Sequence, residues 1–292
     1  MIDSAFITLK MIDVIIITHN RKRLLEKCLE SLISQDFTSR YNIIVFNNHS
    51  SDSTDELFKK QCFKKIRIIK TAQHLNLTAC KNLALEKTTE EIVAFIDDDC
   101  IASKNWLSII STSLPDYDIA SGPVLPIPKT KFPWWWKKSL NWLIGINPNN
   151  EYLPLGSNIA FRKSALIKLL NDKKLQSPNI NFVLPYVEDY YRIKKSLELG
   201  FSLKINQNMF VFHYIPKKRL TIPYLVKRSY REGFSRATWE QKKKFSIHSL
   251  TNLLAMPLRL ILSFDINYLM RIIMHISYAT NYIRLHKTNN HK

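Results

Sequence analysis

A run of five apolar residues followed directly by three aspartates constrains this sequence more than any other feature. Residues 92–96 (IVAFI) have the length and composition of a buried parallel strand, and Asp97, Asp98 and Asp99 end it. In open α/β sheets, ligands bind just beyond the carboxyl ends of such strands. Adjacent carboxylates repel one another unless a cation lies among them. The triplet therefore predicts a divalent metal ion that holds a diphosphate; the alternative is a solvated acidic turn.

Short apolar runs alternate with segments of helical spacing through the first hundred residues. The pattern predicts strands at 13–18, 42–46, 66–69 and 92–96, with helices at 23–33, 52–62 and 76–87. This rhythm is typical of a parallel sheet covered by helices. Further strands are predicted at 156–162, 201–205 and 209–213, and helices at 163–170, at 186–199 and from 224 onward. Residues 121–155, rich in Pro, Trp and Asn, are predicted to form irregular connections over an open site.

Composition narrows the class of partner. The chain has 292 residues, 46% of them hydrophobic, which is enough for a full core. Its formal charge of +19 favours phosphorylated substrates, an anionic membrane surface or nucleic acid. No zinc-finger spacing or basic heptad accompanies the basic residues, so we do not expect a nucleic-acid partner. Cys28, Cys62, Cys80 and Cys100 form no CxxC pair, which predicts reduced buried thiols. With no export signal visible, a cytoplasmic location is expected.

Six segments carry a resemblance to a known family when taken in order. They are DVIIITHNR at 13–21, NNHSSDST at 47–54, NLTACKN at 76–82, FIDDD at 95–99, GSNIAFR at 156–162 and VED at 187–189. Together they resemble the family 2 glycosyltransferases of the GT-A fold. The resemblance implies an α/β fold with a Rossmann-like, mostly parallel central sheet flanked by helices, here with a C-terminal helical extension. Residues 1–120 would form the nucleotide-sugar half, 121–215 the acceptor half of the same domain, and 216–292 the helical segment.

The resemblance implies an inverting glycosyltransferase. It would move a sugar from a nucleotide-diphosphate donor to a hydroxyl of a glycan or lipid-linked acceptor, in polysaccharide biosynthesis. Asp97, Asp99 and His213 would hold Mn²⁺ or Mg²⁺, which acts as a Lewis acid on the departing diphosphate. A structural role is the alternative for His213. Asp189 would be the general base, and Glu188 would orient the acceptor or the neighbouring loop.

Two further groups of residues follow from the same motifs. The donor site would comprise Thr18, Asn20, Arg21, Asn47, Asn48, Asp52, Asn76, Lys81, Asp97 and Asp98. The acceptor side would comprise Asn158, Arg162 and Trp135, although Arg162 has the alternative of a salt bridge to the Glu188-Asp189 pair. The sequence departs from the family at Asn47, where aspartate is usual, and this leaves the nucleotide base open. It also departs at Asn76, where glycine is common, and at Lys81, where a point charge replaces the arginine fork.

The tryptophan-rich segment and the C-terminus allow more than one interpretation. Three interpretations fit residues 132–138 (FPWWWKK): aromatic rings packed under a loop, a stacking surface for an acceptor sugar, or an anchor at a membrane interface. The run at 250–264 is too short to span a bilayer. In 266–285, polar and apolar residues fall on opposite sides of a helix: Asn267, Arg271, His275, Ser277, Asn281 and Arg284 against Leu269, Ile272, Ile273, Ile276 and Ile283. The helix either packs on the catalytic domain or lies in the surface of the inner membrane face, and we favour the second.

The two alternative functional classes are a sugar nucleotidylyltransferase and a non-catalytic binding protein. A sugar nucleotidylyltransferase needs a Gly-rich loop for a triphosphate, and residues 19–24 (HNRKRL) contain no glycine. A non-catalytic binding protein for anionic polymers or a membrane surface is compatible with the charge. It has no use for a base opposite a metal, however. Metal-dependent binding of a nucleoside diphosphate separates the enzyme from the binding protein.

Overall fold

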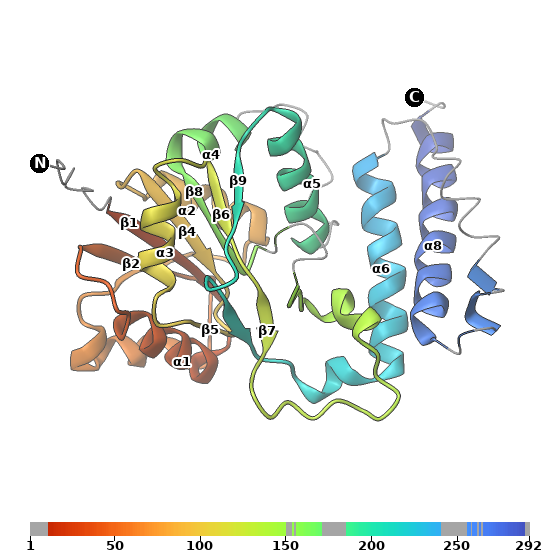
Figure 1. Ribbon diagram of the computed structural model, residues 1–292, viewed down its shortest axis with the longest axis horizontal. Coiled ribbons are helices and arrows are strands. Elements are labelled where there is room, and N and C mark those ends of the chain that lie inside the picture. Colours follow the sequence, from red (N-terminus) through yellow and green to blue (C-terminus); the bar gives the residue numbers. More distant parts are fainter. Residues whose placement is uncertain are drawn as a thin grey trace, which may run out of the picture.

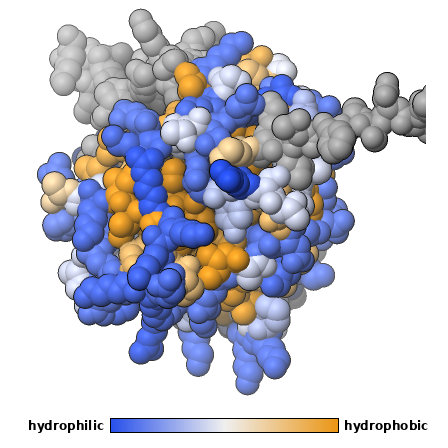
Figure 2. All heavy atoms as spheres, turned by 90° about the vertical axis from the view of Figure 1, so that its left-hand side faces the viewer, coloured by the Kyte–Doolittle hydropathy of each residue, from blue (hydrophilic) through white to orange (hydrophobic). Residues whose placement is uncertain are grey.

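The computed structural model describes residues 11–149, 154, 156–170, 185–240, 256–257, 259–261, 263 and 265–289. A central sheet lies between helices, and the pair α6 and α8 stands beside it at the far side of the molecule (Figure 1). The opposite side of the molecule is mostly hydrophilic around an apolar band (Figure 2).

The central sheet has seven strands in the order β3-β2-β1-β4-β8-β6-β9. Their bounds are β1 Ile12–Thr18, β2 Tyr41–Asn47, β3 Arg67–Lys70, β4 Ile92–Ile96, β6 Ile119–Ser121, β8 Asn158–Arg162 and β9 Leu203–Ile205. Only β8 among these strands runs antiparallel to its neighbours. The mixed α/β class and the mostly parallel sheet are therefore confirmed. Strands from both predicted halves share this one sheet.

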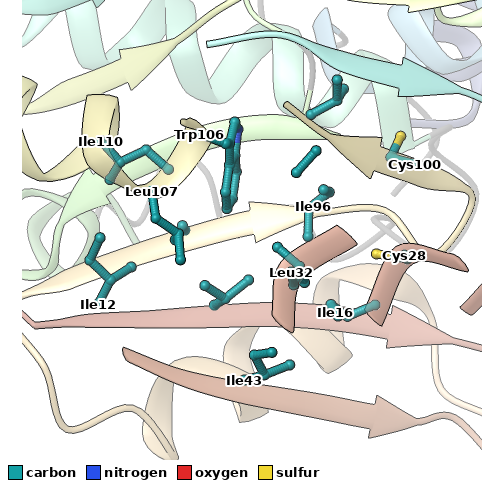
Figure 3. Close-up of a cluster of buried hydrophobic side chains, with 14 of the residues drawn as sticks. Ile12, Ile16, Cys28, Leu32, Ile43, Ile96, Cys100, Trp106, Leu107 and Ile110 are labelled. Carbon is teal, nitrogen blue, oxygen red and sulfur yellow. The ribbon is translucent and has the colours of Figure 1, made fainter. Parts of the chain in front are cut away.

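Burial on both faces explains why the central strands are continuous apolar runs. Every residue of β4 is buried, and β1 is buried except at Ile17. Helix α1 (Lys22–Ile33) covers one face through Leu25, Cys28, Leu29 and Leu32, at the spacing of one helical stripe. Figure 3 shows Cys28 and Cys100 among the apolar side chains of this core. Cys28, Cys80 and Cys100 are buried free thiols as predicted, whereas the thiol of Cys62 is free but exposed.

A second, three-stranded sheet continues beyond β4. Its order is β5-β10-β7, with bounds β5 Cys100–Ala102, β10 Val211–His213 and β7 Val124–Pro126. The antiparallel register pairs His213 with Cys100, directly after the aspartate triplet. The backbone N–H of Tyr214 also donates to the carbonyl oxygen of Asp99 (2.8 Å). Two segments more than a hundred residues apart are thereby fixed side by side.

Five helices surround the sheet strands in addition to the C-terminal pair: α1, α2 (Leu77–Glu86), α3 (Trp106–Ser113), α4 (Lys163–Leu170) and α5 (Pro185–Glu198). The predicted helix at 52–62 is wrong, because the segment forms two short 3₁₀ helices, Thr54–Lys59 and Gln61–Phe63. Lys60 between them is extended, with ψ 137°. The side chain of Asp52 is engaged by the backbone N–H of Lys22 (2.9 Å), which ties the segment to α1 instead.

The C-terminal helices α6 (Ile222–Glu240) and α8 (Ile266–Asn289) lie side by side (Figure 1). Helix α8 buries polar residues of the side that the sequence predicted to face water: Asn267, Ser277 and Asn281. Its Leu269, Ile276 and Ile283 are 38%, 49% and 53% exposed. The reversal is possible because the buried groups are satisfied: Ser277 Oγ, for example, donates to the carbonyl oxygen of Tyr230 (2.7 Å). Within the described ranges, no helix is both long and apolar enough to cross a bilayer.

Gly233 sets how closely α6 and α8 approach. A Cβ at this position would lie 2.0 Å from the Met274 carbonyl oxygen and 2.9 Å from Ser277 Cβ. Gly233→Ala is therefore expected to destabilise the protein by about 1–3 kcal/mol, as overpacking does, although alanine favours helix. Urea unfolding measures the change, with the exposed neighbour Arg231→Ala as the control. A more stable Gly233→Ala protein would show that the two helices are not in close contact.

Candidate active site

The aspartate triplet lies at the carboxyl end of β4, next to the loop that follows β1. Asp98 and Asp99 are 3% and 5% exposed, whereas Asp97 is exposed to solvent. Thr18 Oγ1 donates to Asp98 Oδ2 (2.7 Å). Arg21 Nη1 donates to Asp98 Oδ1 (2.8 Å) and to Asp99 Oδ2 (3.0 Å). Because β1 and β4 are parallel neighbours, their ends meet at this edge and bring the two predicted motifs together.

The three carboxylates differ in their electrostatic surroundings. Desolvation and the charge of Asp99 raise the pKa of Asp97 to about 6. Burial also raises the pKa of Asp98, and Arg21 offsets part of that effect. Burial acts in the same direction on Asp99, but His213, Arg21 and Arg219 outweigh it and hold its pKa below the usual value. Asp99 is thus the best-stabilised anion of the triplet, because its pKa is lowered whereas those of Asp97 and Asp98 are raised.

His213, at the end of β10, and Arg219, in the 3₁₀ helix that follows it, also lie near Asp99. His213 Nε2 lies 3.4 Å from Asp99 Oδ1, and Arg219 Nη2 lies 4.0 Å from Asp99 Oδ2. Gly145, at φ +73°, packs against the imidazole. His213 Nδ1 is buried, and none of the described residues forms a hydrogen bond with it. No sequence motif indicates that the short 3₁₀ helix Lys217–Leu220 brings Arg219 to Asp99.

The carboxylate of Asp99 and the imidazole of His213 are groups that bind divalent metal ions such as Mn²⁺. Carboxylate oxygens and an imidazole nitrogen both suit Mn²⁺, and Asp99 and His213 already lie together. Among the residues that the structure describes, no group of three or more His, Cys, Asp or Glu side chains converges as a complete metal cluster. Asp99 and His213 are therefore two adjacent candidate ligands, with Asp97 nearby in sequence.

Asparagine side chains stabilise the loop that follows β2. Asn47 and Asn48 are 3% and 5% exposed. Asn47 Nδ2 donates to Asp55 Oδ1 (2.8 Å), and Asn48 joins the backbone of Leu75 through both its amide oxygen and its amide nitrogen (2.9 and 2.8 Å). Asn20, at φ +53°, accepts the backbone N–H of Ser51 (2.7 Å). Asn20, Asn47 and Asn48 thus shape the loops.

Helix α2 brings Lys81 to the predicted base, Asp189. Asn76 caps α2, since its Oδ1 accepts the backbone N–H of Ala79 (2.8 Å). Lys81 Nζ lies 2.6 Å from Asp189 Oδ1, although the two residues are 108 positions apart. Asp189 is on α5 and packs so closely against Gly156 that a Cβ there would lie 2.0 Å from Asp189 Oδ2. Glu188 belongs to α5, and its side chain lies outside the described part of the chain.

The predicted acceptor residues are dispersed. Asn158 is fully buried; its amide donates to the carbonyl oxygens of Pro123 and Met209 and accepts from Trp106 Nε1 (2.8 Å). Arg162 lies opposite Ile92 in the β4–β8 register, at the end of β4 away from the triplet. Its guanidinium binds the Leu114 carbonyl (2.6 Å) and lies 3.9 Å from Asp118.

The tryptophan segment divides into packed and exposed rings. Trp135 and Trp136 have ring centroids 5.8 Å apart and pack on the apolar cluster that includes Leu225 and Met274. Trp134 is 96% exposed. Packed aromatics therefore account for two of the three rings, and Trp134 alone is presented to solvent.

Comparison with known proteins identifies the relatives of this fold and site. The family model described as glycosyl transferase family 2 matches residues 13–170, more than half of the chain. Glycosyltransferase AglE of Haloferax volcanii is 29% identical over 122 residues, which are 40% of this chain and 40% of that protein. The glucosyl-dolichyl phosphate glucuronosyltransferase of the same species is 22% identical over 251 residues, 77% of this chain and 76% of that one.

A solved structure shares the fold. The mannosyltransferase PcManGT from Pyrobaculum calidifontis, in complex with GDP-Man and Mn²⁺, superposes with a TM-score of 0.56 at 15% identity. The superposition covers 94% of this chain and 73% of that one. The match to AglE, by contrast, spans well under two thirds of that relative's length.

Proposed function

Because the chain belongs to glycosyl transferase family 2, we propose that it transfers a sugar from a nucleotide-diphosphate donor to an acceptor hydroxyl with inversion. One observation carries the proposal: Asp99, at the carboxyl end of the parallel strands, faces Arg21, His213 and Arg219. Such an edge is where ligands of open α/β sheets bind. A binding protein for anionic polymers has no need of a buried carboxylate among its cationic groups.

The donor's diphosphate occupies the space in front of Asp97 and Asp99. Asp99 and His213 would hold Mn²⁺ or Mg²⁺, with Asp97 as a further ligand, and the ion would supply Lewis-acid stabilisation of the departing diphosphate. Arg21 and Arg219 already lie beside Asp99 and add positive charge where the leaving group gains negative charge. Thr18 keeps Asp98 turned inward, which fixes the backbone of the triplet.

Asp189 accepts the proton of the acceptor hydroxyl as that oxygen bonds to the sugar. Its side chain is 16% exposed, so that the proton transfer takes place in a partly dry site. Its second oxygen, Oδ2, lies in the space that a side chain at position 156 would fill, so the glycine leaves room for it. Asn158 and Arg162 serve the acceptor half through the backbone that they support, because their side chains are engaged elsewhere.

Calorimetric titration with UDP, GDP and dTDP, each with and without Mn²⁺, tests the proposed function. The account predicts that one nucleotide binds and that its affinity depends on the metal. Binding of none of the three would contradict the account and favour the anionic-polymer binding protein. The identity of the nucleotide that binds also resolves the choice that Asn47 leaves open.

The acceptor is lipid-linked, and α8 contacts an anionic membrane surface. The relative named for glucosyl-dolichyl phosphate supports the first point. Exposed Leu269, Ile276 and Ile283 support the second, since a spacing of seven residues places them in one line along the helix. The charge of +19 complements an anionic surface.

Vesicle co-sedimentation at low salt tests this contact. The protein is expected to bind vesicles of phosphatidylcholine with phosphatidylglycerol and not those of phosphatidylcholine alone. Ile276→Asp together with Ile283→Asp is expected to weaken binding about tenfold or more, as the loss of buried apolar area and the added negative charges predict. Ile167→Asp is the matched control, because Ile167 is 41% exposed on α4. Equal binding by all variants would remove α8 from the contact.

A further inference from the structure

Lys81 is ion-paired with the proposed base, and its charge also acts on a carboxylate of the aspartate triplet. Its Nζ is 2.6 Å from Asp189 Oδ1, and the two side chains are 15% and 16% exposed. The charge of the same ammonium group also acts on Asp97, which follows β4. One cation on α2 is thus paired with the base on α5 and interacts electrostatically with the carboxylate end of β4.

The surroundings of Asp189 direct it towards Lys81. Gly156 closes the side of Oδ2, where a Cβ would stand 2.0 Å away. The side chains of this ion pair line a small cavity of about 40 Å³. The rest of its lining is mostly apolar and includes Phe95, Ile159 and Phe161. An ion pair in such partly desolvated surroundings is stronger than one on the open surface. Oδ1 of Asp189 is therefore paired with an ammonium group.

We infer that Lys81 is a positioning residue that couples donor binding to the release of the catalytic base. It holds Asp189 while the donor site is vacant and turns to the diphosphate when the donor arrives. The inference rests on the proposed function. A diphosphate in front of Asp97 carries more negative charge than Asp189, and lysine, a point charge on a flexible four-carbon stem, can follow it. Asp189 Oδ1 then accepts the acceptor's proton only when a donor is present.

A double-mutant cycle tests the coupling without knowledge of the acceptor. The probe is whichever of UDP, GDP or dTDP the wild-type protein binds best with Mn²⁺, titrated calorimetrically. Asp189→Asn is expected to tighten binding about three- to tenfold, as couplings between contacting charges do, because Lys81 loses its competing partner. Lys81→Met is expected to weaken binding, and Asp189→Asn is expected to change nothing further in that background. Lys81→Arg retains the charge and is expected to retain the coupling.

The controls separate this inference from simpler effects. Asp118→Asn removes another ion-paired carboxylate, that of Asp118 with Arg162, and is expected to leave the affinity unchanged. Equal tightening by Asp189→Asn with and without Lys81 would reflect only the loss of a negative charge and would overturn the inference. Unchanged affinity in Asp189→Asn would overturn it as well. A wild-type protein that binds no nucleoside diphosphate would instead defeat the proposed function, and the inference with it.

Discussion

Asp189→Asn is expected to lower the rate of sugar transfer about 10²- to 10⁴-fold, the range of general acid–base catalysis. Asparagine has the shape of aspartate but cannot take up the acceptor's proton. The fold is expected to persist, because an amide can still receive a hydrogen bond from Lys81 Nζ through its oxygen. The rate is measured as release of the nucleoside diphosphate from the donor that the binding screen identifies.

A control variant and a binding measurement show whether the lower rate comes from loss of the catalytic base. Asp118→Asn, at the opposite end of the sheet, is expected to transfer sugar at the wild-type rate. Nucleotide affinity of Asp189→Asn is expected to be at least as high as in the wild type, which separates a catalytic loss from a binding loss. Near-normal turnover by Asp189→Asn would assign the proton transfer to another group.

Asp99→Ala is expected to weaken metal-dependent nucleotide binding by at least about 100-fold, beyond the effect of losing a group that only supports a metal ligand. The substitution removes the carboxylate that Arg21, His213 and Arg219 share. Calorimetry with and without Mn²⁺ measures the loss. Asp116→Ala, an exposed aspartate outside the triplet, is the control and is expected to bind as the wild type does.

The result is informative only if the variant folds. Thermal unfolding of Asp99→Ala in the absence of metal shows whether the three cationic groups tolerate the loss of their common partner. A folded variant that keeps full Mn²⁺-dependent binding would contradict the assignment of Asp99 as a metal ligand.

The sequence predicted the central strands well because burial on both faces leaves a strong signal. The bounds of β4 and α4 agree with the prediction, since an apolar run ended by charges leaves little choice of boundary. The three-residue strands β5, β6 and β7 were missed because none of them lies in a longer apolar or alternating run, whereas the equally short β9 and β10 do. The failed helix at 52–62 had helical composition, but the contact of Asp52 with the start of α1 prevailed over local propensity.

At the site, local motifs were predictable and long-range partners were not. Thr18, Arg21, Asp98 and Asp99 come together because parallel neighbouring strands end at one edge, a relation that the alternation of strand and helix already implies. The pairing of Lys81 with Asp189 and the approach of Arg219 to Asp99 depend on how separate segments pack. Nothing in the local sequence records those distances. The burial of the polar side of α8 has the same origin, because Gly233 lets α6 come close enough to bond it.

Anomalous diffraction from crystals grown with Mn²⁺ and the bound nucleoside diphosphate tests the central claim most directly. The account predicts a manganese peak coordinated by Asp99 and His213 Nε2, with phosphate oxygens completing its ligands at the carboxyl end of β4. A nucleotide bound elsewhere, or bound at this edge with manganese away from both Asp99 and His213, would contradict it.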